Sequence, residues 1–170
     1  MRKLFIPVSM FLMSSAAVFA ADPVNINITG KVVASPCVVN SGSGDLTMDL
    51  GQNIQASTLA TAGSGSTPVT QDLKLTSCPV GTTNVKATFT GTADTTSTTM
   101  YKNTGTATPL AVELSNAEDS SLLSNGTTLT LPVLADNTVT FKLKARAYTA
   151  AGSVTPGTIS SVVVADFTYQ

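Results

Sequence analysis

The sequence contains no histidine and no tryptophan, and only 11% of its residues are charged. Without histidine the chain cannot build Ser-His-Asp or Cys-His catalysis, and most catalytic zinc and copper sites are excluded as well. The lack of tryptophan, with an aromatic content of 5%, argues against a carbohydrate-binding platform. These absences favour a function in binding or assembly over catalysis.

Carboxylates are the remaining candidates for catalysis, because a pair of them could serve a glycosidase. Ten acidic residues are present, but most stand in separate polar turns, as do Asp45, Asp94, Glu118-Asp119 and Asp136. Solvated turn residues explain this distribution better than an acid–base pair. The glycine-rich fragments lie beside Ser and Thr and not before a helix, so they do not indicate a phosphate-binding loop. We therefore expect no enzyme, no cofactor, no metal and no small-molecule substrate.

The first twenty residues have the pattern of a secretory signal peptide. Arg2 and Lys3 precede a short apolar run, and small residues end at Ala20. The run is too short to span a bilayer comfortably, so we expect cleavage after Ala20 and export of a single-domain mature chain. Removing Arg2 and Lys3 from the 9 basic residues leaves 7 against 10 acidic ones, a net charge of −3. This balance argues against nucleic acid or an anionic membrane as a partner.

Cysteine is scarce, with only Cys37 and Cys78. In an exported protein such a pair predicts a disulfide. The bridge would close a loop of about 40 residues and add ~4 kcal/mol by restricting the unfolded chain. Two free buried thiols are the alternative. A zinc site is not supported, because two thiols alone cannot complete a tetrahedral shell.

Threonine is abundant, with 28 residues, and together with valine it gives the composition of a β-sheet protein. Short runs of alternating apolar residues recur between Gly-, Ser-, Thr-, Asn- and Pro-rich turns, which predicts an all-β sandwich. No segment has a sustained helical period, although a short turn of helix could form around Gln55–Ala60. The expected strands are Val24–Val33, Cys37–Asn40, Leu46–Leu50, Val69–Thr76, Asn84–Thr90, Leu110–Leu114, Thr127–Leu134, Thr138–Tyr148 and Ile159–Tyr169.

The two ends of the mature chain have matching patterns. The sequence stops inside the last expected strand, with no further turn or strand, and a core strand left with a free edge invites pairing with another chain. The first segment is amphipathic, which on pattern alone also fits the first strand of the sandwich. Its apolar register holds Val24, Ile26, Ile28, Gly30 and Val32. The apolar register of the last segment holds Ile159, Val163, Ala165, Phe167 and Tyr169. Together the ends suggest a subunit that its neighbour completes.

Several local motifs resemble pilins of the chaperone–usher pathway, and among them the minor tip subunits of type 1 fimbriae. The resemblance covers the mature chain and includes Gly157, fourteenth from the end, and the penultimate Tyr169. Pro23 departs from the pattern, because proline has no N–H to give to a strand ladder. The matching stretches are 30–34, 36–37, 76–82, 89–94, 101–103, 105–107 and 157–159.

The resemblance implies an incomplete immunoglobulin-like sandwich that lacks its final (G) strand and carries an N-terminal donor-strand extension. Residues 1–20 would be the signal peptide, 21–33 the extension and 34–170 the pilin domain. A periplasmic chaperone would lend a strand to the groove beside the last strand. At the outer-membrane usher, the extension of the next subunit would replace it, by strand addition.

The resemblance also assigns roles to residues. Val24, Ile26, Ile28 and Val32 would be donor side chains, with Gly30 where the groove is too shallow for one. The acceptor groove and chaperone-binding strand would include Gly157, Ile159, Val163, Ala165, Phe167, Tyr169 and Gln170, with a basic cleft of the chaperone at the terminal carboxylate.

The expected function is thus that of a minor tip adaptor in a bacterial fimbria, which supports adhesion from the cell surface. A major rod pilin of the same pathway is the nearest alternative. A sugar-binding fimbrial adhesin is the alternative from another functional class. The expected partners are neighbouring pilins, the chaperone and the usher.

Overall fold

The computed structural model describes residues 24–33, 35–42 and 44–170 of the chain. The expected signal peptide, residues 1–20, and the first residues of the expected extension, 21–23, lie outside this range. The chain divides into two units, Met1–Lys31 and Val32–Gln170. In the ranges described, no helix is long and apolar enough to cross a membrane.

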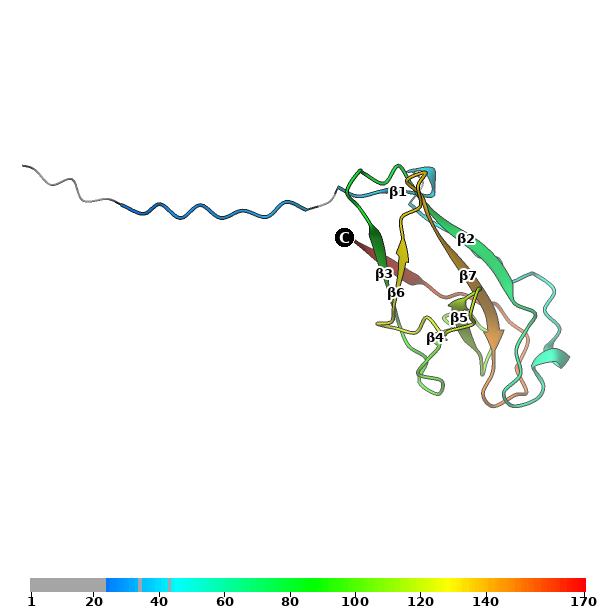
Figure 1. Ribbon diagram of the computed structural model, residues 1–170. Coiled ribbons are helices and arrows are strands. Elements are labelled where there is room, and N and C mark those ends of the chain that lie inside the picture. Colours follow the sequence, from blue (N-terminus) through cyan, green and yellow to red (C-terminus); the bar gives the residue numbers. More distant parts are fainter. Residues whose placement is uncertain (1–23, 34, 43) are drawn as a thin grey trace, which may run out of the picture. The chain divides into compact units, whose positions relative to one another are not determined.

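The second unit contains two antiparallel β-sheets (Figure 1). The five-stranded sheet has the order β1-β2-β7-β5-β4, and the three-stranded sheet has the order β6-β3-β8. Two short 3-10 turns, Asn40–Gly42 and Ala56–Leu59, lie in the connections. The strands are β1 (Val38–Val39), β2 (Val69–Thr76), β3 (Asn84–Gly91), β4 (Tyr101–Lys102), β5 (Ala111–Asn116), β6 (Thr128–Pro132), β7 (Val139–Tyr148) and β8 (Val163–Tyr169).

The alternation of side chains places the core between the sheets. In β7 every second residue from Val139 to Ala147 is buried, while the residues between them, among them Lys142, are exposed or half-buried. β3 contributes Val85, Ala87 and Phe89 from the facing sheet. This period of two is what a half-buried strand requires, and it explains why the sequence pattern predicted these strands well.

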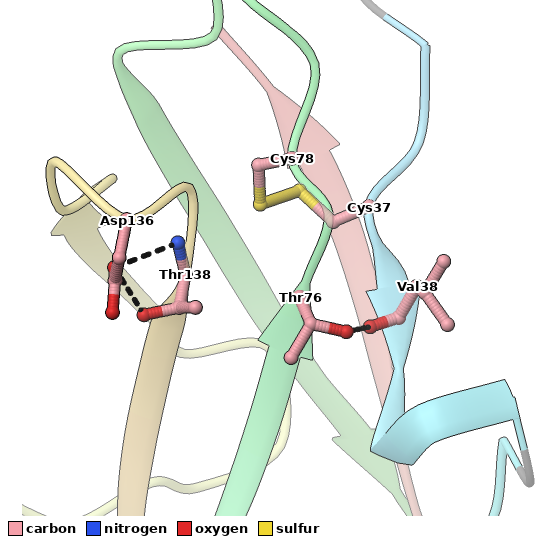
Figure 2. The surroundings of a disulfide bond; sticks show 6 residues. All are labelled: Cys37, Val38, Thr76, Cys78, Asp136 and Thr138. Carbon is pink, nitrogen blue, oxygen red and sulfur yellow. Dashed lines mark hydrogen bonds between the residues drawn. A yellow bond between two sulfur atoms is a disulfide. The ribbon is translucent and has the colours of Figure 1, made fainter.

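A disulfide joins Cys37 and Cys78, with Cα atoms 4.3 Å apart, and the described residues include no free cysteine. Figure 2 shows that it links the chain just before β1 to the chain just after β2. Both cysteines are buried, at 6% and 3% exposure, and the Thr76 hydroxyl donates to the Val38 carbonyl nearby at 3.5 Å. The predicted disulfide is confirmed.

The strand prediction was wrong in four places. Neither Val24–Val33 nor Leu46–Leu50 is a strand, and the last strand begins at Val163 and not at Ile159. The short strand β4, Tyr101–Lys102, was missed. Alternation gives the facing of side chains, but a strand also needs a neighbouring backbone to pair with. The turn of helix considered possible around Gln55–Ala60 is present as the 3-10 turn Ala56–Leu59.

Candidate functional site

Strand β8 is an edge strand with one paired side. It pairs with β3 from Val85↔Tyr169 to Gly91↔Val163, and no other strand in the described range pairs with it. None of its seven residues is fully buried, although every second one is half-buried. The strand is therefore less covered than the buried strand that the sequence pattern suggested. An exposed strand edge of this kind is a template for another chain.

A groove of about 1240 Å³ runs along this edge. On one side it is lined by β8 and the segment before it, from Val154 to Phe167. Its floor consists of core side chains from both sheets, because the sandwich is not closed here. These floor residues are Leu73, Phe89, Val112, Leu114, Leu143 and Ala145.

The second wall of the groove is the segment 44–55. Here Leu46, Met48 and Leu50 are half-buried against the core, and the residues between them are exposed. This is the side-chain pattern of a strand without a ladder. Two strand-like walls thus face the groove, and the described residues leave the space between them without a strand.

The lower part of the groove is lined by a second apolar cluster, which contains Leu59, Ala107, Leu110 and Val154. The segment before β8 is fastened here on its outer side. The Ala107 amide donates to the Thr158 carbonyl at 3.0 Å, and the Thr104 amide donates to Ser160 at 2.8 Å. The segment before β8 is thus paired with residues 104–107 on one side and lines the groove on the other.

Gly157 is needed for this close approach. A Cβ at Gly157 would overlap the Ala107 amide nitrogen and the Thr106 carbonyl carbon, and a Cβ at Gly105 would overlap the Thr158 carbonyl. The two glycines let two backbones meet without side chains between them. The Gly157 found in the sequence therefore has a packing role beside its place in the lining.

The seven residues expected in the acceptor groove fall into two sets. Gly157, Ile159, Val163, Ala165 and Phe167 line the groove, whereas Tyr169 and Gln170 do not. Tyr169 is half-buried against the core, and desolvation raises the pKa of its hydroxyl against the effect of a hydrogen bond at the Cys37 backbone. An oxygen of the terminal carboxylate of Gln170 accepts from the Thr83 and Asn84 amides at 2.6 and 3.1 Å.

The expected donor residues are exposed. Val24, Ile26, Ile28 and Val32 are 82%, 80%, 91% and 99% exposed, and residues 24–33 contain no strand or helix. Four large apolar side chains in sequence are costly to leave in water, so such a segment is suited to binding a hydrophobic groove.

The groove is lined by two carboxylates, Asp45 and Asp49, and Asp49 accepts from the Gly51 amide and the Gln52 side chain. Within the described ranges, no group of three or more His, Cys, Asp or Glu side chains could hold a metal ion.

Comparisons with known proteins identify the family. The fimbrial protein family matches residues 26–170. The chain is 39% identical to protein FimG of Escherichia coli K12 over 167 residues, which is 98% of this chain and 96% of FimG. The chain belongs to the fimbrial protein family. It is a pilin, and the predicted family, the incomplete sandwich and the location in a surface fimbria are confirmed.

Two further relatives have different roles in their names. The S-fimbrial adhesin protein SfaS of Escherichia coli O6:K15:H31 (strain 536 / UPEC) is 43% identical over 154 residues, 89% of each chain. The P pilus rod subunit PapA has a related structure, with a TM-score of 0.63 and 26% identity, over 80% of this pilin and 100% of PapA.

Sequence reasoning missed part of the groove. Within the wall 44–55 the alternation predicts only an ordinary strand at Leu46–Leu50, and the sequence does not indicate the lower cluster around Leu59 and Val154. One signal was available, because Leu46, Met48 and Leu50 alternate in a segment that follows directly on a glycine-rich turn. The lower cluster left no periodic signal, since Leu59, Ala107, Leu110 and Val154 come from three separate loops.

Proposed function

We propose that this pilin polymerises by donor-strand exchange, with its groove as acceptor and residues 21–33 as donor. The observation that supports this most directly is the groove along the free edge of β8, between two strand-like walls. A strand laid there would pair with β8 and cover the floor residues. Backbone hydrogen bonds would give affinity, and alternate side chains would give specificity.

The donor segment suits a groove of this kind. Four aliphatic side chains, Val24, Ile26, Ile28 and Val32, are available for burial at ~1.5–3 kcal/mol each, or roughly 6–12 kcal/mol before ordering costs. Gly30 presents no side chain at the position between Ile28 and Val32. The intervening residues Asn25, Asn27, Thr29 and Lys31 are polar and would stay toward solvent.

A periplasmic chaperone and an outer-membrane usher complete the proposed pathway. With the groove empty, core residues such as Leu143 border open space, which is a liability before assembly. A strand lent by a chaperone would cover them. Exchange for the extension of the next pilin would then take place at the usher.

Within the fimbria, we infer the role of a minor tip adaptor. The identity to FimG extends over nearly the whole of both chains, whereas the likeness to the rod subunit PapA is 26%. An adaptor both accepts and donates a strand, and the chain has an acceptor groove and a segment fit to donate. A subunit of this kind supports adhesion by holding the adhesin in the fibre.

The substitution Ile26→Asp tests the donor role. A carboxylate in an apolar pocket is strongly unfavourable, so this variant should fold but fail to join the preceding subunit. Asn25→Asp is the matched control, since residue 25 belongs to the polar register. Incorporation is measured by immunoblotting of fimbriae sheared from cells. Normal incorporation of Ile26→Asp would refute the donor role.

Co-purification from the periplasm tests the chaperone. The subunit should be recovered with one chaperone molecule per subunit. Recovery of the subunit from the periplasm without any bound chaperone would contradict this part of the proposal.

Adhesion by the subunit itself is a second candidate function, favoured by the 43% identity to a protein named as an adhesin. Binding of the purified subunit, with its groove filled, to immobilised glycans distinguishes the two. An adaptor gives no saturable binding, whereas an adhesin does.

A further inference from the structure

Charged residues of the unit 32–170 are concentrated on its flanks and are rare at its two ends. The end that carries the disulfide comprises residues 32–33 and 35–36 and the loops 77–83 and 133–138, and we call it the upper end (Figure 1). The lower end comprises the loops 51–68, 92–100, 103–110 and 149–162. In the parts described, each end has a single charged side chain, Asp136 above and Asp94 below, and the terminal carboxylate of Gln170 also lies at the upper end, where it accepts from the Thr83 amide.

Both of these carboxylates are engaged in their own turns. Asp136 accepts from the Thr138 amide and hydroxyl at 3.2 and 2.7 Å (Figure 2). Asp94 accepts from the Thr96 and Ser97 amides at 2.9 and 2.8 Å. The Gln170 carboxylate is likewise hydrogen-bonded, to the Thr83 and Asn84 amides and the Thr83 hydroxyl, so covering these groups would not leave an unpartnered charge.

The upper end also exposes apolar side chains. Val80 is 98% exposed and Leu134 is 56% exposed. Their loops are neighbours, because the Cys78 amide donates to Asn137 at 3.0 Å and the Val133 amide donates to Thr83 at 2.9 Å. Two large apolar side chains exposed on adjoining loops are suited to contact with another protein, and we call the pair the Val80/Leu134 patch.

The short stretch of chain between the donor segment and Cys37 limits which protein can reach this patch. Cys37 is bonded to Cys78, two residues before Val80. Between Val33 and Cys37 the chain can extend at most ~14 Å, since each residue adds about 3.5 Å. A subunit that holds residues 24–33 in its groove must therefore lie close to the upper end.

We propose that Val80 and Leu134 dock on the uncharged lower end of the pilin that accepts the donor segment. This rests on the proposed donor-strand exchange and adds a second, end-to-end contact to it. A head-to-tail contact is required for an open fibre, because like ends meeting would close a dimer. With the donor segment inserted, the short linker holds the two ends at high effective concentration, so a small patch suffices.

The contact is tested in the two-subunit complex formed by this pilin and its acceptor, purified from sheared fimbriae. The test variant is Val80→Asn with Leu134→Asn. The matched control is Leu122→Asn, because Leu122 is also exposed, at 39%, but lies in a loop next to β5. Two quantities are measured: the rate of dissociation in guanidinium, and the spread of the angle between the two domains in electron micrographs.

In the double variant we expect dissociation about tenfold faster than in wild type and a broader spread of angles, because the buried apolar contact is lost. Leu122→Asn should match wild type in both. Equal rates and equal angles in the double variant and wild type would overturn the end-to-end contact while leaving strand exchange intact. If the proposed strand exchange is wrong, the result is different: the complex then forms equally well with Ile26→Asp.

Discussion

Phe141 of β7 and Phe167 of β8 approach each other across the sandwich, with ring centroids 5.9 Å apart and planes tilted by 41°. Phe141 is fully buried, whereas Phe167 is half-buried and lines the groove. The pair connects the exposed edge strand to the closed part of the core. This contact helps to hold β8 against the core, although only one edge of β8 is paired in the described range.

Replacing Phe167 by alanine should therefore destabilise the domain. We expect a loss of about 2 kcal/mol in the free energy of unfolding, below the 3–5 kcal/mol of a fully buried phenylalanine, because Phe167 is only partly buried and lines the groove. Urea unfolding of the chaperone-free subunit measures it. Thr168→Ala, at the adjacent exposed position, is the control. Equal stability of the two variants would show that Phe167 does not anchor β8.

Replacement by alanine should lower the stability of the domain at Gly157 but not at Gly30. Gly157→Ala forces a Cβ into the Ala107 backbone, and we expect a loss of about 1–3 kcal/mol or misfolding. Gly30 has no atom within 4 Å of a built Cβ, so Gly30→Ala should leave the domain as stable as wild type. Thermal melts of both variants check this. A destabilised Gly30→Ala with an unaffected Gly157→Ala would reverse the assignment.

The disulfide should be fully formed and should stabilise the domain. Alkylation of native periplasmic protein is expected to find no free thiol. The double change Cys37→Ser with Cys78→Ser should lower the free energy of unfolding by about 4 kcal/mol, as expected for closing a loop of 41 residues. Two alkylatable cysteines in native material would contradict the structure.

Stability should fall at high pH through Tyr101. This residue is completely buried, its hydroxyl donates to the Leu123 carbonyl at 2.8 Å, and desolvation raises its pKa to about 12. The unfolded chain ionises near pH 10, so this stabilisation is complete below pH 10 and is lost as the pH rises through 12. Tyr101→Phe should cost about 1 kcal/mol at neutral pH through the lost hydrogen bond.

Unfolding titrations from pH 7 to 12 compare the two proteins. The decline above pH 10 should be shallower in Tyr101→Phe, and the part that remains is assigned to Tyr169, whose pKa is also raised by desolvation. Identical pH profiles would mean that Tyr101 does not contribute.

Alternation carried most of the fold prediction, because a half-buried strand must repeat every two residues. It located β2, β3 and β7 closely and placed Val163, Ala165 and Phe167 on one face. It could not tell a paired strand from an unpaired one, which is why Leu46–Leu50 was assigned a ladder that it lacks. Backbone pairing depends on two segments, so the side-chain alternation of one segment does not show whether it is paired.

Contacts between loops were also beyond sequence reasoning. The approach of Gly105 to Thr158 and of Gly157 to Ala107 joins segments about 50 residues apart, and no local pattern encodes it. The same holds for the patch at Val80 and Leu134. Single apolar residues in turns are common on protein surfaces, and these two are notable only because the fold brings their loops together.

The most direct test of the central claim is a thermal melt of the isolated subunit with and without a donor peptide. The peptides carry the N-terminal extensions of pilins, residues 21–33 of this chain included, and the control peptide carries Ile26→Asp. At a peptide concentration about 100 times Kd, binding adds about 2.7 kcal/mol, so Tm should rise by about 5–10 °C. The control peptide should give no shift. A subunit that melts cooperatively at high temperature, unchanged by any donor peptide or chaperone, would mean that the sandwich is already complete and that the subunit does not assemble by accepting a strand.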